Sequence, residues 1–303
     1  MTTQKIMSPR AWAELMLLSL IWGASFLSIR IALDEITVLT SVAHRVGWAA
    51  LALWIVVLVA RFRLPRNPRV WVAFFVMGML NNVIPFSLMA WGQLHIETGL
   101  TSILNAATAI FGVLVAAALF ADERLSSRRA IGVALGFLGV ATAIGLKNLA
   151  QFDIRSLAQL AVLAGTLSYA LAGAWARAQL SDQPPQVNAA GMLTGSALVM
   201  IPAALLVDGP IRLDLAPITW AAIAYYALIA TAFAYLLYYR VLAMAGSGNL
   251  LLCTLLIPPV AIVLGAAVRG EELAPGAYAG FAILGAGLLI LDGRLLRRRH
   301  TSA

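Results

Sequence analysis

Asn81 and Asn82 place hydrogen-bonding side chains in the middle of the apolar run Trp71–Trp91, and Pro85 interrupts the same stretch. An amide side chain donates and accepts hydrogen bonds, and deep in hydrocarbon it has no water to bond. We therefore expect these amides to face protein or a water-filled cavity, where they can bind a polar solute. The chemistry that they indicate is recognition through hydrogen bonds.

Small and polar residues recur at i, i+4, i+7 and i+11 in two neighbouring predicted helices, which places them on one face of each helix. The two stripes are Gly78, Asn82, Pro85 and Met89, followed by Thr101, Asn105, Thr108 and Gly112. Two such stripes on adjacent helices indicate a lined pathway. The alternative is that these residues are polar contacts that hold helices together.

His44 and Arg45 are ionisable residues inside another apolar run. Such groups cost ~2.5–3.5 kcal/mol at the centre of a membrane, so they are expected to face the interior or an aqueous path. The Arg45 guanidinium can bind a substrate carboxylate through two hydrogen bonds. The alternatives are snorkelling to the interface or an ion pair, as an outer gate, with Asp34, Glu35 or Glu97. A histidine titrates near neutral pH, so His44 is either a proton carrier or a satisfied interfacial residue.

Trp22 and Tyr169 are aromatic residues at the midpoints of two predicted helices. Aromatic residues at the membrane edges serve as interfacial anchors, but that role does not explain aromatics at mid-depth. They either pack in the core or line a cavity and stack on apolar cargo. Lining is favoured because both helices place an aromatic there, and Ser25 lies on the same face as Trp22.

Hydrophobic residues make up 62% of the 303-residue chain and charged residues 11%, and the mean hydropathy is +0.90. A soluble domain carries roughly 25% charged residues, so we predict an all-α integral membrane protein with the lipid bilayer as a partner. The net charge of +8 resides at the ends of apolar runs, which is typical of membrane topology and not of nucleic-acid binding. A single cysteine, Cys253, excludes an internal disulfide and a cysteine-rich metal site. The chain is predicted to have no cofactor, no metal and no catalytic residues.

Ten apolar segments are about long enough to cross ~30 Å of hydrocarbon. They lie at residues 12–32, 38–60, 71–91, 99–121, 130–146, 157–178, 187–207, 218–240, 248–268 and 276–292. If the N-terminus is inside, fifteen of the 21 lysines and arginines fall on the inner side. This bias predicts that both termini are cytoplasmic, and it places Glu14 at the cytoplasmic interface.

The two halves of the chain repeat each other at a shift of 147–148 residues. The aligned pairs are Trp22 with Tyr169, Arg30 with Arg177, Gly132 with Gly280 and Gly139 with Gly287. The predicted repeats are residues 1–148 and 149–303. Each repeat holds five spans, an odd number, so the second is inverted relative to the first. Inverted repeats are the usual architecture of alternating-access transporters, in which the site lies near the midplane.

The motifs of this chain resemble those of the drug/metabolite transporter superfamily, in its EamA-type branch. The matching residues are Ile21-Trp22-Gly23-Ala24-Ser25-Phe26 with Arg30, His44-Arg45, Asn81-Asn82-Val83-Ile84-Pro85-Phe86, Trp91-Gly92-Gln93, Leu104-Asn105-Ala106 and Asp122-Glu123-Arg124-Leu125-Ser126. In place of the proline that many relatives carry after Asn105, this chain has Ala109 and Ile110. The second half keeps Pro258 and Pro259, so we expect a helix break there alone.

The resemblance implies an inner-membrane exporter of amino acids in bacteria, including aromatic and other apolar ones, that works by alternating access. The substrate-binding residues predicted from the patterns above are Trp22, Ser25, His44, Arg45, Gly78, Asn81, Asn82, Pro85, Thr101, Asn105, Thr108 and Tyr169. The alternatives are a nucleotide-sugar, sugar-phosphate or drug transporter of the same fold, or a membrane enzyme or scaffold. A phosphate carrier needs several cations at mid-depth, and only Arg45 comes close. A monomer and a dimer both stay open.

The charge bias predicts that the loop at residues 61–69 is cytoplasmic and that residues 147–155 are outside. Single cysteines at Asn67 and Gln151, in a background without Cys253, test this orientation with an impermeant thiol reagent. We expect labelling from outside at position 151 only. Labelling of intact cells at position 67 would overturn the orientation.

Overall fold

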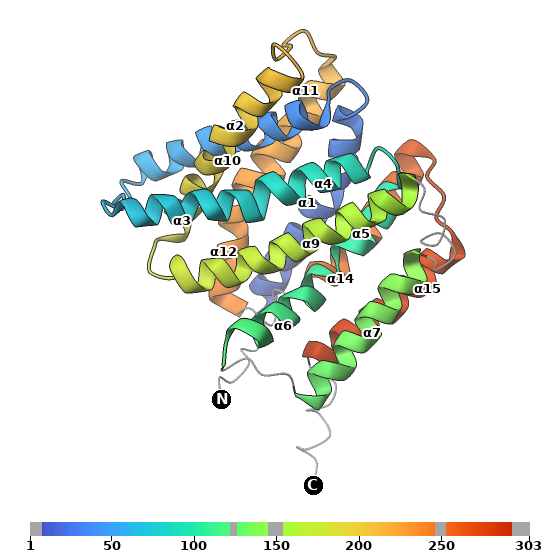
Figure 1. The fold of residues 1–303 in the computed structure, drawn as a ribbon. Coiled ribbons are helices and arrows are strands. Elements are labelled where there is room, and N and C mark those ends of the chain that lie inside the picture. Colours follow the sequence, from blue (N-terminus) through green and yellow to red (C-terminus); the bar gives the residue numbers. More distant parts are fainter. Residues whose placement is uncertain (1–7, 122–125, 145–153, 246–252, 293–303) are drawn as a thin grey trace.

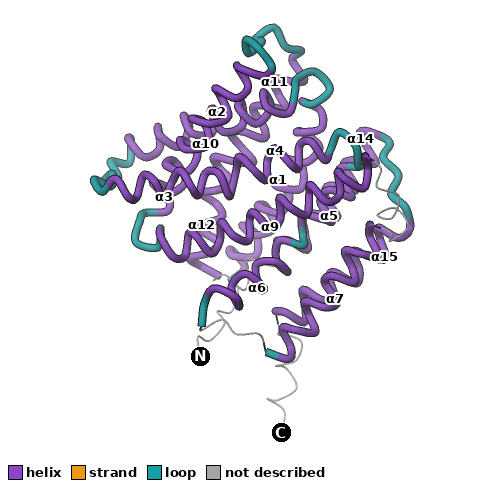
Figure 2. The backbone as a smooth tube through the Cα atoms, viewed as in Figure 1, coloured by secondary structure: helices purple, strands orange, loops and turns teal. Residues whose placement is uncertain are grey.

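The computed structural model consists almost entirely of helices (Figure 2). It describes residues 8–121, 126–144, 154–245 and 253–292. Within these residues, seven helices are long and apolar enough to cross a membrane, and the apolar helices Leu256–Arg269 and Pro275–Ile290 are shorter. Together with α7 (Ser127–Ile144) they make up the ten predicted spans of an all-helical, multi-pass membrane protein.

Each half of the chain contributes five spans. Those of the first half are α1 (Pro9–Ala32), α2 (Val38–Val59), α3 (Pro68–Gly78) with η1 (Met79–Val83) and α4 (Ile84–Gly92), α5 (Thr98–Asn105) with α6 (Thr108–Leu119), and α7. Those of the second half are α9 (Ile154–Gln179), α10 (Pro185–Val207), α11 (Pro217–Ala224) with η2 (Tyr225–Phe233) and α12 (Ala234–Ala245), α14 (Cys253–Arg269) and α15 (Pro275–Asp292). The predicted boundary between residues 148 and 149 lies outside the described residues.

Local sequence signals begin many of these helices. Proline occupies the first position of α1, α3, α10, α11 and α15, where its missing N–H would have no partner in any case. The Ser8 side chain accepts a hydrogen bond from the Ala11 N–H (3.2 Å) at the start of α1, and the Thr37 side chain caps α2 in the same way. These caps satisfy donors that the helix itself leaves free.

The third span of each half contains a π-helical segment, η1 in one and η2 in the other. Pro85 follows η1, and because its ring clashes with the carbonyl four residues earlier, the helix widens there. A π turn holds an extra residue and rotates the faces that follow it. Gly78 and Asn82 consequently pack against α10, whereas Pro85 and Met89 pack against α9. The first predicted stripe therefore faces two helices instead of one.

The fourth span is interrupted between Asn105, where α5 ends, and Thr108, where α6 begins. The backbone there closes tight turns of the i→i−3 type in place of α-helical hydrogen bonds. In the second half, α14 runs without a break through Pro258 and Pro259. The expectation of a break in the second half alone is wrong, because the interruption arises in the first half without a proline.

Helix packing follows a pseudo-two-fold axis that exchanges the two halves. Three pairs of equivalent helices pack on each other: α2 with α10, α7 with α15, and α5 with α14. The other contacts occur between equivalent spans of the two halves. Helix α1 packs on α14 as its equivalent α9 packs on α6. Helix α3, in the third span of the first half, packs on α10 as η2, in the third span of the second half, packs on α2. The five-helix inverted repeat predicted from sequence is thus present in the packing.

The pair formed by α7 and α15 lies at one edge of the bundle (Figure 1). Glycines bring the two backbones together: a Cβ on Gly280 would lie 2.5 Å from Gly139 O, and one on Gly287 would lie 2.8 Å from Gly132 O. The axis converts one of these contacts into the other, because Gly132 aligns with Gly280 and Gly139 with Gly287. Gly139, Gly280 and Gly287 are therefore required by close helix packing, because a Cβ on each would lie within 3 Å of backbone atoms of the partner helix.

The start of α1 and the end of α15 lie toward the same end of the molecule in Figure 1, as an even number of spans requires. We call the opposite end, which carries residues 33–37, 93–97, 208–216 and 270–274, the outer end. This name follows the orientation predicted from the arginines.

We predict that Gly280→Ala lowers the free energy of unfolding by about 1–3 kcal/mol, because the new methyl group overlaps backbone atoms of α7. Gly173→Ala is the matched control, since a Cβ there meets no atom within 4 Å. Thermal unfolding of the purified variants in detergent measures both. Equal midpoints for the two variants would contradict the glycine contact.

Candidate functional site

Arg45 lies in a polar layer where α2, α4, α9 and η2 meet. Its Nε donates a hydrogen bond to Thr231 Oγ1 (3.0 Å), and its guanidinium carbon lies 3.7 Å from the centre of the Phe86 ring. A cation over an aromatic face is stabilised by the negative face of the ring. The hydroxyls of Tyr169 and Tyr235 lie within electrostatic range of the guanidinium. The fold thus brings Arg45 and Tyr169, both predicted site residues, into one layer.

Arg45 has no carboxylate partner among the described residues. The acidic residues predicted as its alternative partners are all engaged elsewhere. Asp34 pairs with Arg30 and Arg269, Glu97 pairs with Arg155, and Glu35 caps α11. The positive charge of Arg45 is balanced only by an aromatic ring and neutral hydroxyls, which leaves it able to bind an anion.

Asn81 and Asn82 are joined to the second half of the chain by Tyr235. The Tyr235 hydroxyl accepts a hydrogen bond from Asn81 Nδ2 (2.9 Å) and donates one to Asn82 Oδ1 (3.2 Å). Asn82 is fully buried, and its Nδ2 donates to Ser196 Oγ (2.9 Å) on α10. Ser196 also contacts the backbone of Gly78. Asn82 and Gly78 thus hold helices together, and Asn81 is the more exposed amide.

The first helix of each half supplies a hydrogen bond to the π segment of the other half. Trp22 Nε1 on α1 donates to Ala230 O in η2 (3.1 Å), and Ser168 Oγ on α9 donates to Leu80 O in η1 (2.7 Å). A π turn distorts the regular hydrogen-bond ladder, and in hydrocarbon its carbonyls need partners from the protein. Trp22 therefore stabilises η2 directly.

The two repeat-related aromatics differ in their surroundings. Tyr169 lies edge-on to Phe86, with 6.5 Å between ring centres, within the polar layer. Trp22 contacts Tyr238 instead, with 6.0 Å between ring centres. Ser25 donates to the Trp22 carbonyl of its own helix (2.6 Å). Tyr169 is therefore beside Arg45, whereas Trp22 lies outside the polar layer, where α1 packs against η2 and α12.

His44 faces away from Arg45, towards α11. Its Nδ1 accepts a hydrogen bond from Trp48 Nε1 (3.2 Å), and its ring lies edge-on to Trp220, 5.6 Å between centres. An accepting Nδ1 carries no proton, so the neutral ring is protonated on Nε2. This Nε2 is buried and has no hydrogen-bond partner among the described residues.

The second predicted stripe lies apart from Arg45, in a part of the bundle formed with α9 and α14. Thr101 is buried and donates to Glu97 O (3.1 Å), and Thr108 donates to Asn105 O (2.8 Å). Asn105 Oδ1 is buried without a partner in the described structure. The fold therefore brings Arg45, Asn81, Asn82 and Tyr169 together and keeps the Thr101–Thr108 stripe separate.

Thr231 and Tyr235 were not predicted from the sequence. A weaker signal could have found Tyr235, which is an aromatic residue inside the predicted span 218–240 but lies away from its midpoint, unlike Trp22 and Tyr169 in their helices. No comparable signal marked Thr231, because its role depends on the π turn. Its Oγ1 donates to Tyr226 O, five residues earlier (2.7 Å), and accepts from Arg45.

At the outer end, three carboxylates each cap a helix of the other half. Asp208 accepts a hydrogen bond from the Thr40 N–H of α2 (3.0 Å). Glu35 accepts one from the Ala216 N–H before α11 (3.1 Å), and Glu271 accepts one from the Thr98 hydroxyl of α5 (2.7 Å). A negative charge at a helix N-terminus is stabilised by the free N–H groups and the helix dipole. These caps hold the two halves together at this end.

Two ion pairs at the outer end also connect the halves, Asp34 with Arg269 and Glu97 with Arg155. Burial raises the pKa of Asp34, but its hydrogen bonds and charge contacts with Arg269 and Arg30 hold that pKa below its ordinary value. Asp34 is therefore ionised at neutral pH. Its contribution to stability is present above its ordinary pKa and is lost as the pH falls through the lowered value.

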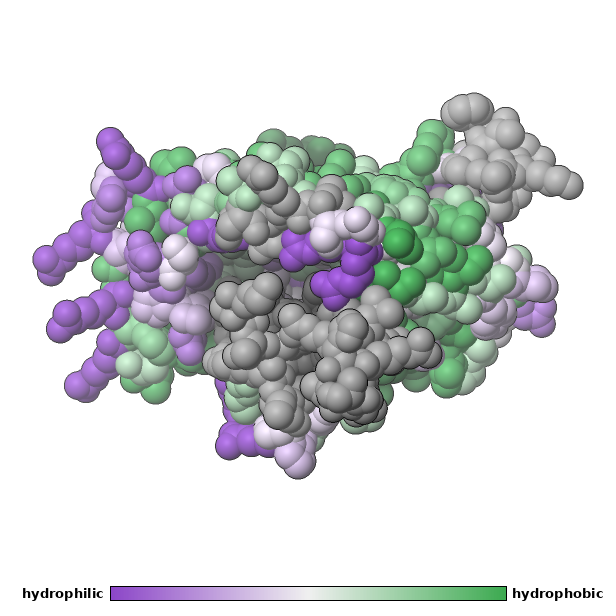
Figure 3. All heavy atoms as spheres, turned by 90° about the horizontal axis from the view of Figure 1, so that it is seen from below, coloured by the Kyte–Doolittle hydropathy of each residue, from purple (hydrophilic) through white to green (hydrophobic). Residues whose placement is uncertain are grey.

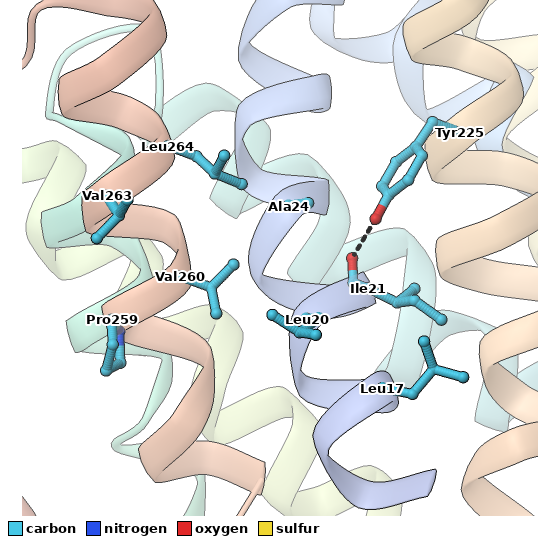
Figure 4. Close-up of a pocket in the computed structure, with 9 residues that line it drawn as sticks. All are labelled: Leu17, Leu20, Ile21, Ala24, Tyr225, Pro259, Val260, Val263 and Leu264. Carbon is cyan, nitrogen blue, oxygen red and sulfur yellow. Dashed lines mark hydrogen bonds between the residues drawn. The ribbon is translucent and has the colours of Figure 1, made fainter. Parts of the chain in front are cut away.

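A shallow groove of about 660 Å³ runs between α1 and α14, as Figure 4 shows. Its walls are apolar and include Leu20 and Val260. The one hydroxyl there, on Tyr225, donates to Ile21 O (3.1 Å). Since this groove offers no free polar group and shares no residue with the polar layer, it suits hydrocarbon and cannot recognise a charged solute.

A family model of EamA-like transporters matches the chain twice, at residues 11–145 and 156–291. The protein belongs to the EamA-like transporter family. Membership agrees with the resemblance found in the sequence, and it makes the protein a membrane transporter rather than an enzyme. No group of three or more histidine, cysteine or acidic side chains that could hold a metal occurs in the described residues.

Curated relatives match over nearly the whole chain. A probable terminal-alkyne amino-acid exporter of Streptantibioticus cattleyicolor is 27% identical over 300 residues, which cover 98% of both chains. The uncharacterized transporter YoaV of Bacillus subtilis is 19% identical over 93% of this chain and 96% of its own. A solved crystal structure aligns with a TM-score of 0.68 at 17% identity, over 98% of this chain and all of the other, and it supports the fold alone.

We predict that Glu271→Ala lowers the free energy of unfolding by about 1–3 kcal/mol, because the Thr98 hydroxyl and the Gly99 N–H lose their acceptor. The matched control is Glu272→Ala, since Glu272 is exposed and makes no hydrogen bond in the described structure. Thermal unfolding in detergent at neutral pH compares them. If both variants melt at the same temperature as the parent, the outer-end cap is not a stabilising contact.

Proposed function

We propose that the protein exports amino acids across the inner membrane of a bacterium by alternating access, with both termini in the cytoplasm. The observation that carries this proposal is that the positive charge of Arg45 is not paired with a carboxylate in the described residues. Arg45 lies inside the span α2. A half-buried cation of this kind, inside a membrane span, stabilises an anion bound beside it.

The geometry of Arg45 favours a carboxylate. Its Nε is taken by Thr231 and its face by Phe86. The terminal Nη1 and Nη2 atoms make no hydrogen bond within the described structure, and together they form a planar fork that matches the two oxygens of a carboxylate. A single fork also favours amino acids over sugar phosphates, which carry more negative charge.

The rest of the polar layer is neutral and aromatic. Phe86 and Tyr169 offer ring faces and edges, and the Asn81 amide offers hydrogen bonds. Apolar contacts discriminate weakly between side chains, because one methylene is worth only ~1–3 kcal/mol. We therefore expect a permissive transporter that requires the shared carboxylate but discriminates weakly between amino-acid side chains. The name of the Streptantibioticus relative, an amino-acid exporter, supports the same class of cargo.

Alternating access requires the outer end to open. In the described structure three carboxylate caps and two ion pairs join the two halves at the outer end, whereas the ion pair of Arg240 with Glu14 joins them near the start of α1. The larger number of links supports taking the outer end as the closed one. Export would break these links after the cargo has bound at Arg45. The interrupted fourth span and the two π segments are positions where the helices can bend with little loss of hydrogen bonding.

Counterflow in liposomes tests the proposal directly. The decisive pair of solutes is phenylalanine and phenethylamine, which lacks only the carboxylate. We expect exchange of labelled phenylalanine and of several other amino acids, and no competition by phenethylamine or by a sugar phosphate. Exchange of phenethylamine at the rate of phenylalanine would overturn the role given to the carboxylate.

We predict that Arg45→Gln lowers transport of all accepted amino acids together, by about 10- to 100-fold, because each loses the same charged hydrogen bonds. Arg45→Lys keeps the charge but not the fork, so it should restore only part of the rate. The control is Arg212→Gln, which alters an exposed arginine paired with Asp214.

Tyr169→Ala should instead change the ranking of large and small amino acids, since it enlarges the space beside Phe86 and Arg45 in the polar layer. Competition assays at matched expression separate the two effects. The proposed division of roles fails if Arg45→Gln spares any carboxylate cargo or if Tyr169→Ala leaves the ranking unchanged.

A further inference from the structure

Four arginines, Arg61, Arg63, Arg66 and Arg69, are exposed on the segment that follows α2 and on the first turn of α3. We call residues 61–69 the basic loop. None of the four has a carboxylate within ion-pair distance in the described residues, whereas six other arginines pair with acids. Those six are Arg10, Arg30, Arg155, Arg212, Arg240 and Arg269. The basic loop thus concentrates positive charge that the protein itself does not neutralise.

The basic loop is held in place by its neighbours. Trp71 Nε1 donates a hydrogen bond to Pro65 O (3.0 Å), and the Trp71 ring stacks on Trp54, with 6.3 Å between centres and 13° between planes. Asn67 caps the first turn of α3 through the Arg69 N–H (3.0 Å), and Arg61 adopts a left-handed backbone with φ of 53°. A loop with this much support presents its arginines in a defined arrangement.

Apolar residues are exposed directly beside these arginines. Leu58, Val59 and Leu64 are 65%, 78% and 42% exposed. Trp71, which is also exposed and bonds Pro65 of the basic loop, is the residue type that anchors proteins at the membrane interface. In Figure 3 long hydrophilic side chains extend from one edge of the molecule, next to hydrophobic surface. The exposed apolar residues match the acyl chains of a phospholipid, and the neighbouring guanidinium groups match its phosphate headgroup.

We propose that the basic loop binds the headgroup of an anionic phospholipid, and that this lipid stabilises the transporter. The arginines bind the phosphate through charge-assisted hydrogen bonds, and the acyl chains lie on Leu58, Val59 and Leu64. A soluble phosphate or a nucleic acid would make no use of the exposed apolar residues, so a lipid is the better match.

The position of the basic loop connects this lipid to the transport site. The loop joins α2, which carries Arg45, to α3 and η1, which carry Asn81. A bound headgroup restrains the ends of both helices and therefore the distance between the two groups. The lipid-binding test below does not depend on which solute the protein transports.

The test is a lipid titration of the purified full-length protein in detergent. Dioleoyl phosphatidylglycerol is compared with dioleoyl phosphatidylcholine, and the thermal unfolding midpoint and the lipid retained in native mass spectrometry are measured. We expect phosphatidylglycerol alone to raise the midpoint. The double variant Arg63→Gln/Arg66→Gln should bind it about 30-fold more weakly, since each arginine near a lipid surface contributes a factor of roughly five.

The matched control is Arg128→Gln/Arg129→Gln at the start of α7, which removes the same charge on the same predicted side. It should bind phosphatidylglycerol as the parent does. Equal loss in both double variants would show diffuse attraction and overturn the site. Equal stabilisation by phosphatidylcholine, or displacement of the lipid by inorganic phosphate at the same concentration, would also overturn it.

Discussion

The need to satisfy every backbone polar group inside hydrocarbon governs this structure. It explains why the spans are helices, and it also explains how the helices tolerate irregular turns. Side chains from the opposite half bond carbonyls of both π segments: Trp22 bonds Ala230 O and Ser168 bonds Leu80 O. Because each half supplies what the other lacks, neither repeat could keep its third span in this form alone.

The pseudo-two-fold symmetry organises packing, but the site itself is asymmetric. Glycines on α7 and α15 meet in symmetric pairs, and the three equivalent helix pairs pack on the axis. Arg45 and the Asn81–Asn82 pair, in contrast, come from the first half, whereas Thr231, Tyr235 and Tyr169 come from the second. The bound solute would therefore touch both halves, which is what a site at the interface of two moving repeats requires.

Charged residues have different surroundings in three parts of the bundle. At the outer end, acids and bases join the halves and are paired with one another. In the polar layer, one cation is surrounded by neutral groups. On the basic loop, four arginines are left to solvent and lipid. A paired charge holds structure, an unpaired cation inside the protein favours an anionic cargo, and unpaired surface charge favours a membrane surface.

The amino-acid sequence by itself determined the ten spans, the repeat, the family and four members of the polar layer, because hydropathy and mid-depth polar residues are visible in one dimension. Only the tertiary structure decided which polar residues meet. A π turn before Pro85 rotated the first stripe, and the break at residues 106–107 formed without a proline. Tyr235 and Thr231 join Asn81 and Arg45 across about 150 and 190 positions of the chain. Such contacts depend on helix rotation and on which half packs against the other, and neither is encoded in local spacing.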